Sequence, residues 1–466
     1  MTPPIHNADA AVGIDTTGRP RRGGQRLLRL PHWGLAGGNA GQRPGRRASP
    51  AALDHLRPRS ATAPGTIGDR RVRRSPDRIR TTQPTGELVL QASQPLRVAL
   101  LAPPTATVPP SGLGGLDMVR WLAEGLAARG HQVTLVGAGL DWLAAGVYAL
   151  IDTDPRGGQR ASAEIVERLH AERAGKALER LGPVDVVSDH TRTGWLPAGG
   201  QGLHAPTVQT SYRPVVEVWE PAPRVAGHLG WVAVSEHQRR NAPDMPWVEV
   251  IHPAIPVGEH LLSPRHGGPC VYLGPLLDSH GAGLALAAAH KAGRPIVLAG
   301  TQPSPKATAY TEVELRPQLA DGDELLEAVS LLERWKLLAD ASCLVAPLHP
   351  QVPFSLEVVE AMAYGTPVVT MVDTVGAELV SHGLSGLVIS DPVLLPGAIA
   401  KAEQLDPRRV RSHAANQFDL VGMVSAYEWL LTKLGTEAPA GGAVGTATRS
   451  DPLVPLATPA PTEGTG

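Results

Sequence analysis

The stretch PFSLEVVEAMAYGTPVV, Pro353 to Val369, indicates the fold. Ser355 is a predicted helix N-cap, and apolar residues recur at helical spacing from Leu356 to Ala363. Gly365 should end this helix, and a β-branched strand should follow Pro367. Because the first N–H groups of a helix have no partner within it, the predicted helix presents donors that can face an anion.

A second predicted element gives this helix its context. The apolar run from Ala341 to Ala346 predicts a strand just before it. The order strand, loop, helix puts the loop at the carboxyl end of a parallel strand, where open α/β sheets bind ligands. Glu357 and Glu360 lie on the first two turns. Either they serve a ligand, or they only interact favourably with the helix dipole.

Further residues follow a recognisable order around this helix. They are Phe354, Glu360 to Ala363, Gly365 to Val369, Gly376, Glu378, Gly383 and Ser385 to Val388. This order resembles the nucleotide-sugar-binding signature of the retaining glycosyltransferases of family 4, which have the GT-B fold. The resemblance implies that Glu360 holds the ribose hydroxyls of the donor nucleotide. It also implies that the backbone amides of Phe354, Ser355 and Leu356 cradle the diphosphate and the sugar.

Donor-facing positions depart from the family's pattern. The family has a Glu eight residues before the position of Glu360, where it contacts the donor sugar, and this chain has Val352. The family also has an Arg and a Lys that clamp the diphosphate, and this chain has Pro275 and His280. Losing two charged hydrogen bonds costs about 3 to 6 kcal/mol, or about two to four decades in rate. Protonated His280 would restore part of the charge, as would Arg213, Arg239 or Lys306 if one of them reached the site.

The amino-terminal half begins with a strand, a glycine-rich loop and a helix. Arg97 to Ala102 is the predicted strand, and the helix runs from Leu116 to Arg129. A dinucleotide-binding fingerprint is excluded, because the G-x-G-x-x-G spacing is absent. The loop resembles the first loop of the GT-B amino domain, which implies that Gly114 and Gly115 let backbone amides approach the donor phosphate and the acceptor. The alternative is a tight turn without a ligand.

One histidine in this half is a candidate catalytic residue. Val184 to His190 reads as a strand that ends in polar residues, and its resemblance to the family implies that His190 lies at the active site. A hydrogen-bonding role without catalysis is the alternative reading. After the predicted strand Thr207 to Thr210, the family often has a histidine that contacts the donor sugar. Tyr212 stands there instead.

Composition supports a two-domain protein. The chain has 466 residues, is 42% hydrophobic and carries a net charge of −1, which fits two domains of roughly 150 to 200 residues each. No apolar run approaches the roughly 18 residues of a membrane span, so we expect no transmembrane segment and a cytoplasmic location. Cys270 and Cys343 lie in apolar runs without metal-ligand spacing, which indicates core packing.

Both ends of the chain are expected to be disordered. Residues 1–95 contain sixteen Arg, no Lys and six acidic residues, without sustained periodicity. This segment is either a solvated tail, an extension from a mis-set start codon, or a basic arm for nucleic acid or membrane. We expect no nucleic-acid partner, since the tail has few aromatic residues to stack on bases. Residues 435–466 form a second tail rich in Ala, Gly, Pro and Thr.

The predicted fold class is α/β with GT-B architecture, in which two doubly wound Rossmann-like domains face a cleft. Residues 96–255 would form the acceptor-side domain and residues 256–410 the nucleotide-sugar domain. A C-terminal helix, residues 411–434, would cross back to the first domain. Within the second domain we expect a helix over Asp323 to Ala339.

The expected function is transfer of a sugar, with retention, from a nucleotide-diphosphate-sugar donor to an unknown sugar, lipid or small-molecule acceptor. The fold family needs no metal and no cofactor for this reaction. The alternative is a non-catalytic GT-B-like protein that binds a nucleotide or sugar and has lost turnover. Replacements at the donor-facing positions Val352, Pro275, His280 and Tyr212 motivate this alternative.

Overall fold

The computed structural model describes residues 94–103, 115–137, 147–149, 163–181, 183–191, 205–214, 228–259, 267–302, 304–327 and 329–437. Gly114 and most of the two expected tails therefore lie outside the described residues. The last helix continues to Glu437, a few residues into the expected second tail. No helix among these residues has the length and apolar character needed to cross a bilayer.

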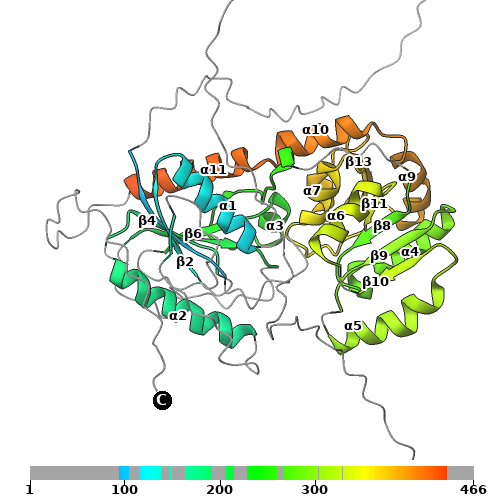
Figure 1. Ribbon diagram of the computed structural model, residues 1–466, viewed down its shortest axis with the longest axis horizontal. Helices are drawn as coiled ribbons and strands as arrows, with labels where there is room; N and C mark the ends of the chain where they lie inside the picture. Colours follow the sequence, from blue (N-terminus) through cyan, green and yellow to red (C-terminus); the bar gives the residue numbers. More distant parts are fainter. Residues whose placement is uncertain are drawn as a thin grey trace, which may run out of the picture. The chain divides into compact units, whose positions relative to one another are not determined.

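The first half is built on a seven-stranded parallel sheet of order β3-β2-β1-β4-β5-β6-β7 (Figure 1). Its strands are β1 (Arg97–Leu101), β2 (Gln132–Val136), β3 (Val147–Ala149), β4 (Val186–Asp189), β5 (Thr207–Ser211), β6 (His228–Ala233) and β7 (Trp247–Val250). Its helices are α1 (Gly115–Ala128), α2 (Ala163–Leu181) and α3 (Glu236–Asn241). The strand order reverses between β1 and β4, as in a doubly wound sheet.

The second half repeats this plan with a six-stranded parallel sheet of order β10-β9-β8-β11-β12-β13. Its strands are β8 (Cys270–Leu273), β9 (Ile296–Ala299), β10 (Glu324–Leu326), β11 (Leu344–Ala346), β12 (Val368–Met371) and β13 (Gly386–Ile389). Its helices are α4 (Ala282–Lys291), α5 (Pro305–Tyr310), α6 (Leu331–Asp340), α7 (Leu356–Ala363), α8 (Gly376–Leu379), α9 (Leu395–Ala402) and α10 (Pro407–Gln417). The order reverses between β8 and β11. The prediction of an α/β fold with two doubly wound sheets is confirmed.

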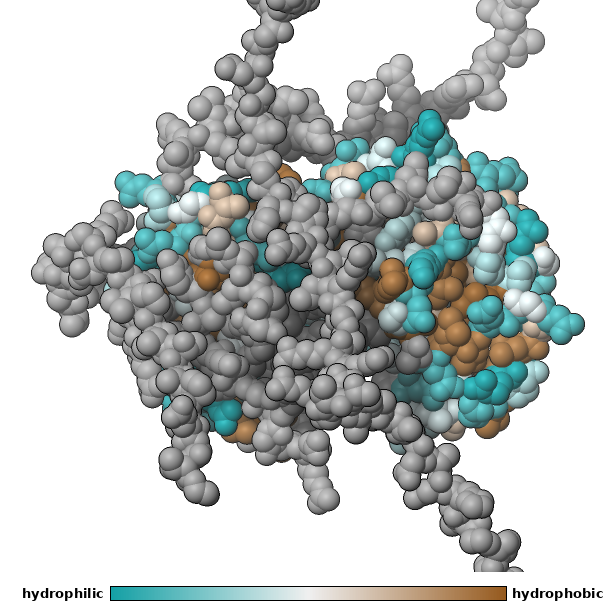
Figure 2. Space-filling view, viewed as in Figure 1, coloured by the Kyte–Doolittle hydropathy of each residue, from teal (hydrophilic) through white to brown (hydrophobic). Residues whose placement is uncertain are grey.

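Burial on both faces explains why the strands of the second sheet read as continuous apolar runs. Val271 and Leu273 belong to one core cluster, whereas Cys270 and Tyr272 belong to another, since successive side chains of a strand point to opposite faces. Cys270 and Cys343 are free, buried thiols with their Sγ atoms 3.8 Å apart. Hydrophobic residues also show on the visible face around α4 (Figure 2).

The chain returns to the first core through its last helix, α11 (Leu420–Glu437). Tyr427, Leu430 and Leu431 of α11 share a hydrophobic cluster with Leu122 and Leu126 of α1. The segment expected to be one C-terminal helix is two helices, because α10 ends at Gln417 before α11 begins. The boundaries at residues 255 and 410 stay predictions.

The expected helix over Asp323 to Ala339 is wrong in its first part. This segment contains strand β10, and α6 begins only at Leu331. Ser330 and Glu333 form a capping box: the Ser330 hydroxyl accepts from the Glu333 amide at 3.3 Å, and the Glu333 carboxylate accepts from the Ser330 amide at 2.8 Å. This Ser-x-x-Glu spacing was readable in the sequence and marks the true start of the helix.

Candidate functional site

The candidate site in the second half lies where the strand order reverses. The loops that follow β8 and β11, residues 274–281 and 347–355, start at the carboxyl ends of neighbouring parallel strands. Doubly wound sheets bind ligands at this place, because the two loops diverge to opposite faces and leave a crevice between them.

Helix α7 starts and ends as its sequence predicts. The Ser355 side chain accepts a hydrogen bond from the Val358 amide at 3.4 Å, and Gly365, with φ +85°, follows the last turn. Within the described part of the chain, no group accepts a hydrogen bond from the backbone N–H of Phe354, Ser355 or Leu356. The start of α7 therefore has donors that are available to an anionic ligand.

Glu360 is held by a buried arginine that the sequence did not single out. Arg334 of α6 forms ion pairs with Glu360 and, at 3.7 Å, with Glu357. The Trp335 indole N–H also donates to Glu360 Oε1 at 3.4 Å, and Glu360 is 0% exposed. Burial raises the pKa of Glu360, and the Arg334 guanidinium opposes this effect. A contact between Glu360 and a ribose stays a prediction.

The structure shows what occupies the other donor-facing positions. Val352 packs against the hydrophobic core of the second half, so its side chain provides no acceptor for a sugar. The Pro275 carbonyl accepts a hydrogen bond from the Tyr272 hydroxyl at 2.8 Å, which fixes the loop after β8. Arg239, a candidate replacement for the missing cations, pairs with Glu236 at 2.7 Å on α3.

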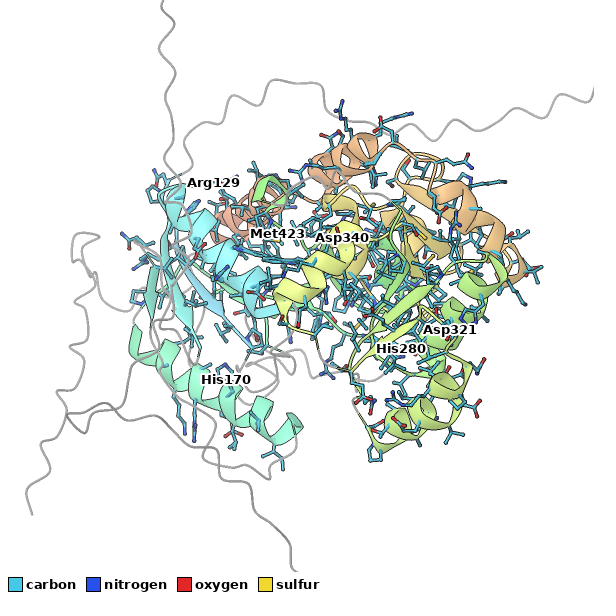
Figure 3. The ribbon with its side chains drawn as sticks, turned by 45° about the vertical axis from the view of Figure 1, so that its right-hand side comes forward. Arg129, His170, His280, Asp321, Asp340 and Met423 are labelled. Carbon is cyan, nitrogen blue, oxygen red and sulfur yellow. The ribbon has the colours of Figure 1, made fainter. Side chains whose placement is uncertain are left out.

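His280 has a partner that sequence analysis missed. His280 ends the short turn Asp278–His280 (Figure 3), and its ring centroid lies 6.3 Å from that of His349 in the loop after β11. Burial, followed by the charge of His349, lowers the pKa of His280. Leu348, next to His349, has φ +32°, a strained conformation that costs about 1 to 3 kcal/mol and is typical of functional sites.

His190 lies in the first half, inside a buried polar network. Its Nε2 and Nδ1 atoms hydrogen bond with Ser188 Oγ at 3.0 Å and with the Tyr212 hydroxyl at 2.9 Å. Burial lowers the pKa of His190 to about 3, so the ring is neutral. The Tyr427 ring of α11 lies 5.6 Å from the His190 ring, centroid to centroid and tilted by 47°, and its hydroxyl hydrogen bonds with Thr210 at 2.9 Å. A catalytic role for His190 stays a prediction, as do the roles of Gly115, the first residue of α1, and Gly114.

Glu378 connects α8 with the start of α3. Its carboxylate accepts hydrogen bonds from the backbone N–H groups of Glu236 at 2.9 Å and His237 at 2.7 Å, and it pairs with His252 at 2.7 Å. Burial raises the pKa of Glu378, but the hydrogen bonds from His252 and from the two amides outweigh this and lower it overall. In this structure Glu378 thus caps a helix, which the sequence did not indicate.

One family model matches the chain by sequence. The model for "Glycosyl transferases group 1" matches residues 270–403, which contain β8 to β13 and the two loops described above. No curated protein matches the chain.

Solved structures match a larger part of the chain. AviGT4, a glycosyltransferase involved in avilamycin A biosynthesis, is 25% identical, with a TM-score of 0.56 over 73% of this chain and 98% of its own. Sucrose-phosphate synthase from Thermosynechococcus elongatus is 16% identical, with a TM-score of 0.58 over 73% and 99%. Anabaena HepE in complex with UDP-glucose is 16% identical, with a TM-score of 0.52 over 72% and 100%. The chain therefore has the fold of the GT-B glycosyltransferases, with a glycosyltransferase group 1 match in its second half.

Proposed function

We propose that this protein is a glycosyltransferase that moves a sugar, with retention, from a nucleotide-diphosphate-sugar donor to an acceptor. The observation that carries the proposal is the start of α7: the N–H groups of Phe354, Ser355 and Leu356 have no described acceptor and lie at the carboxyl end of β11. Amide donors at a helix start suit a diphosphate. HepE, one of the similar structures, binds UDP-glucose.

The roles of individual residues follow from this placement. The amides at the start of α7 and the backbone at Gly114 and Gly115 would hold the diphosphate and sugar, together with His280. Glu360 would accept hydrogen bonds from the ribose, and Arg334 would favour its ionised form against the opposing effect of burial. His190 would lie by the reacting centre. We further propose that the reaction takes place in the cytoplasm and needs no metal ion or cofactor, so turnover should survive a chelator.

A non-catalytic nucleotide-binding protein is the second candidate function. It is favoured by Val352, which packs into the core, and by Pro275 and His280, which stand where fixed cations would stabilise the departing diphosphate.

One experiment separates the two candidates. A panel of UDP-, GDP- and ADP-sugars is titrated into the full chain by calorimetry, and release of free nucleoside diphosphate is followed with sugar, lipid and small-molecule acceptors. Binding with acceptor-dependent release supports the glycosyltransferase. Binding without release across the panel supports the non-catalytic protein. If no nucleotide binds, both candidates are wrong.

A further inference from the structure

Two imidazoles occupy the point at which the second sheet reverses its strand order. His280 follows β8 and His349 follows β11, and these two strands are neighbours in the sheet. The ring centroids are 6.3 Å apart, with an angle of 31° between the ring planes. Both residues are partly exposed, so a ligand can reach the rings.

Close packing of the two loops fixes this arrangement. Gly281 has φ +83°, and a Cβ atom at this position would lie 2.5 Å from Pro347 Cγ. Only glycine allows the loop after β8 to approach the loop after β11 this closely. The Tyr272 hydroxyl also lies within hydrogen-bonding distance of the carbonyl oxygens of Pro275, at 2.8 Å, and His280, at 3.3 Å.

The hydrogen bonds of the rings determine which nitrogen is available. The Gln351 amide donates to His349 Nδ1 at 3.1 Å, so a neutral His349 ring carries its proton on Nε2. His280 Nδ1 lies 3.2 Å from Ser279 Oγ. Among the residues that the structure describes, neither Nε2 atom has a hydrogen-bond partner. Each ring can therefore offer an N–H donor without being charged.

The surrounding backbone supports a binding role for this pair. Leu348 is the one residue other than glycine with positive φ in the described part of the chain, and it directly precedes His349. Strained backbone of this kind persists where the surrounding structure holds it, often at ligand sites. Helix α4 begins directly after His280, with Gly281 as N-cap and no side-chain cap. The N–H of Gly283 is hydrogen-bonded to Tyr310, so it is the N–H of Ala282 that adds to the same donor-rich region.

We propose that His280 and His349 together bind the diphosphate of the nucleotide sugar, as a pair of N–H donors in place of a cationic clamp. This inference rests on the proposed function, because it assigns residues to the diphosphate of that donor. It adds His349 as a binding residue. It also explains why Pro275 can replace one of the two cationic residues that bind the diphosphate in the family, since His349 in the loop after β11 supplies the second N–H donor.

The test compares each nucleoside diphosphate with its parent nucleoside. Calorimetry measures the affinities of UDP, GDP and ADP and of uridine, guanosine and adenosine for the wild-type chain. The diphosphate that binds is then used with His280→Leu, His349→Leu and the double variant. Each single variant should weaken diphosphate binding about 10- to 150-fold and leave nucleoside binding unchanged, because only the diphosphate accepts these hydrogen bonds.

Two controls separate binding from loop damage. His349→Gln keeps an N–H donor and should restore part of the affinity. His382→Leu changes an exposed histidine in the loop before β13 and should leave the diphosphate affinity unchanged. Diphosphate affinities equal to wild type in both single variants would overturn the inference. Equal losses for diphosphate and nucleoside would overturn it too. If the wild-type chain binds no diphosphate, the proposed function itself fails.

Discussion

Replacing Arg334 by Met tests the buried ion pair beside the candidate site. Glu360 is fully buried and Arg334 is 8% exposed, so removing the guanidinium leaves a carboxylate without its cation in the core. Breaking a buried pair in this way costs about 3 to 5 kcal/mol. For a unit of about 150 to 250 residues, each kcal/mol corresponds to about 2 to 4 °C, so we expect the Tm to fall by about 6 to 20 °C at pH 7.5.

The pH dependence of this loss gives the test its specificity. Burial already holds the folded-state pKa of Glu360 above its ordinary value of 4.5, and losing Arg334 should raise it further. An acid with a raised folded-state pKa destabilises the fold as the pH rises from the unfolded-state pKa through the folded-state pKa. The loss caused by Arg334→Met should therefore be smaller at pH 5 than at pH 7.5, because a raised pKa lets Glu360 take up a proton more readily as the pH falls.

Thermal unfolding of the full chain, followed by circular dichroism at both pH values, measures the effect. Arg316→Met is the matched control: Arg316 pairs with Glu312 and Glu327 on the surface, so its loss should leave the Tm nearly unchanged at both pH values. The double variant Arg334→Met, Glu360→Met should recover most of the lost stability, since it leaves no unpaired buried charge. A loss below about 1 kcal/mol for Arg334→Met, or an equal loss at both pH values, refutes the reasoning.

Three further predictions concern loop packing, a helix cap and the buried network. Gly281→Ala adds a methyl group against Pro347 and should lower the free energy of unfolding in denaturant titrations by about 2 kcal/mol or more. Gly293 also has positive φ but has open space around it, so Gly293→Ala should lower the free energy of unfolding by only about 1 kcal/mol. Burial raises the pKa of Glu378, but its hydrogen bonds lower the pKa overall, so the carboxylate stabilises the fold above the unfolded-state value of 4.5. This stabilisation is lost as the pH falls through the folded-state pKa. Glu378→Gln should therefore show a smaller drop in Tm between pH 5 and pH 3.5 than wild type. Tyr427→Phe leaves the buried Thr210 hydroxyl on β5 without the Tyr427 hydroxyl as its partner. It should lower the free energy of unfolding by about 1 to 3 kcal/mol, equally at pH 6 and pH 8.

Local patterns in the sequence predicted the helix that defines the site. One short segment contains the N-cap at Ser355, the apolar stripe and the helix stop at Gly365. Each of these features depends on residues close in the sequence, so it can be predicted without knowing any tertiary contact. Strand β10 shows the opposite case. It has only three residues, Glu324–Leu326, and a strand this short shows no reliable periodicity, so the capping box at Ser330 was the better guide.

Contacts between distant segments were not predictable in this way. Arg334 and Glu360 are 26 positions apart, and nothing in the spacing of the residues links α6 to the second turn of α7. The burial of His190 depends in part on Tyr427, which arrives with α11 after the whole second sheet. Arg334 and Tyr427 could be identified as partners of Glu360 and His190 only from the three-dimensional arrangement of the helices around the sheets.

Binding and turnover make different demands on the site, and this difference decides how the replaced residues should be judged. A ground-state diphosphate is already charged, so neutral N–H donors from helix starts and from His280 and His349 suffice to hold it. Catalysis requires interactions that strengthen as the sugar departs and negative charge grows on the diphosphate. A fixed guanidinium supplies such an interaction at once, whereas an imidazole whose pKa is lowered, as that of His280 is, supplies it only after taking up a proton. Replacement of the cationic pair therefore weakens the case for fast turnover much more than the case for donor binding.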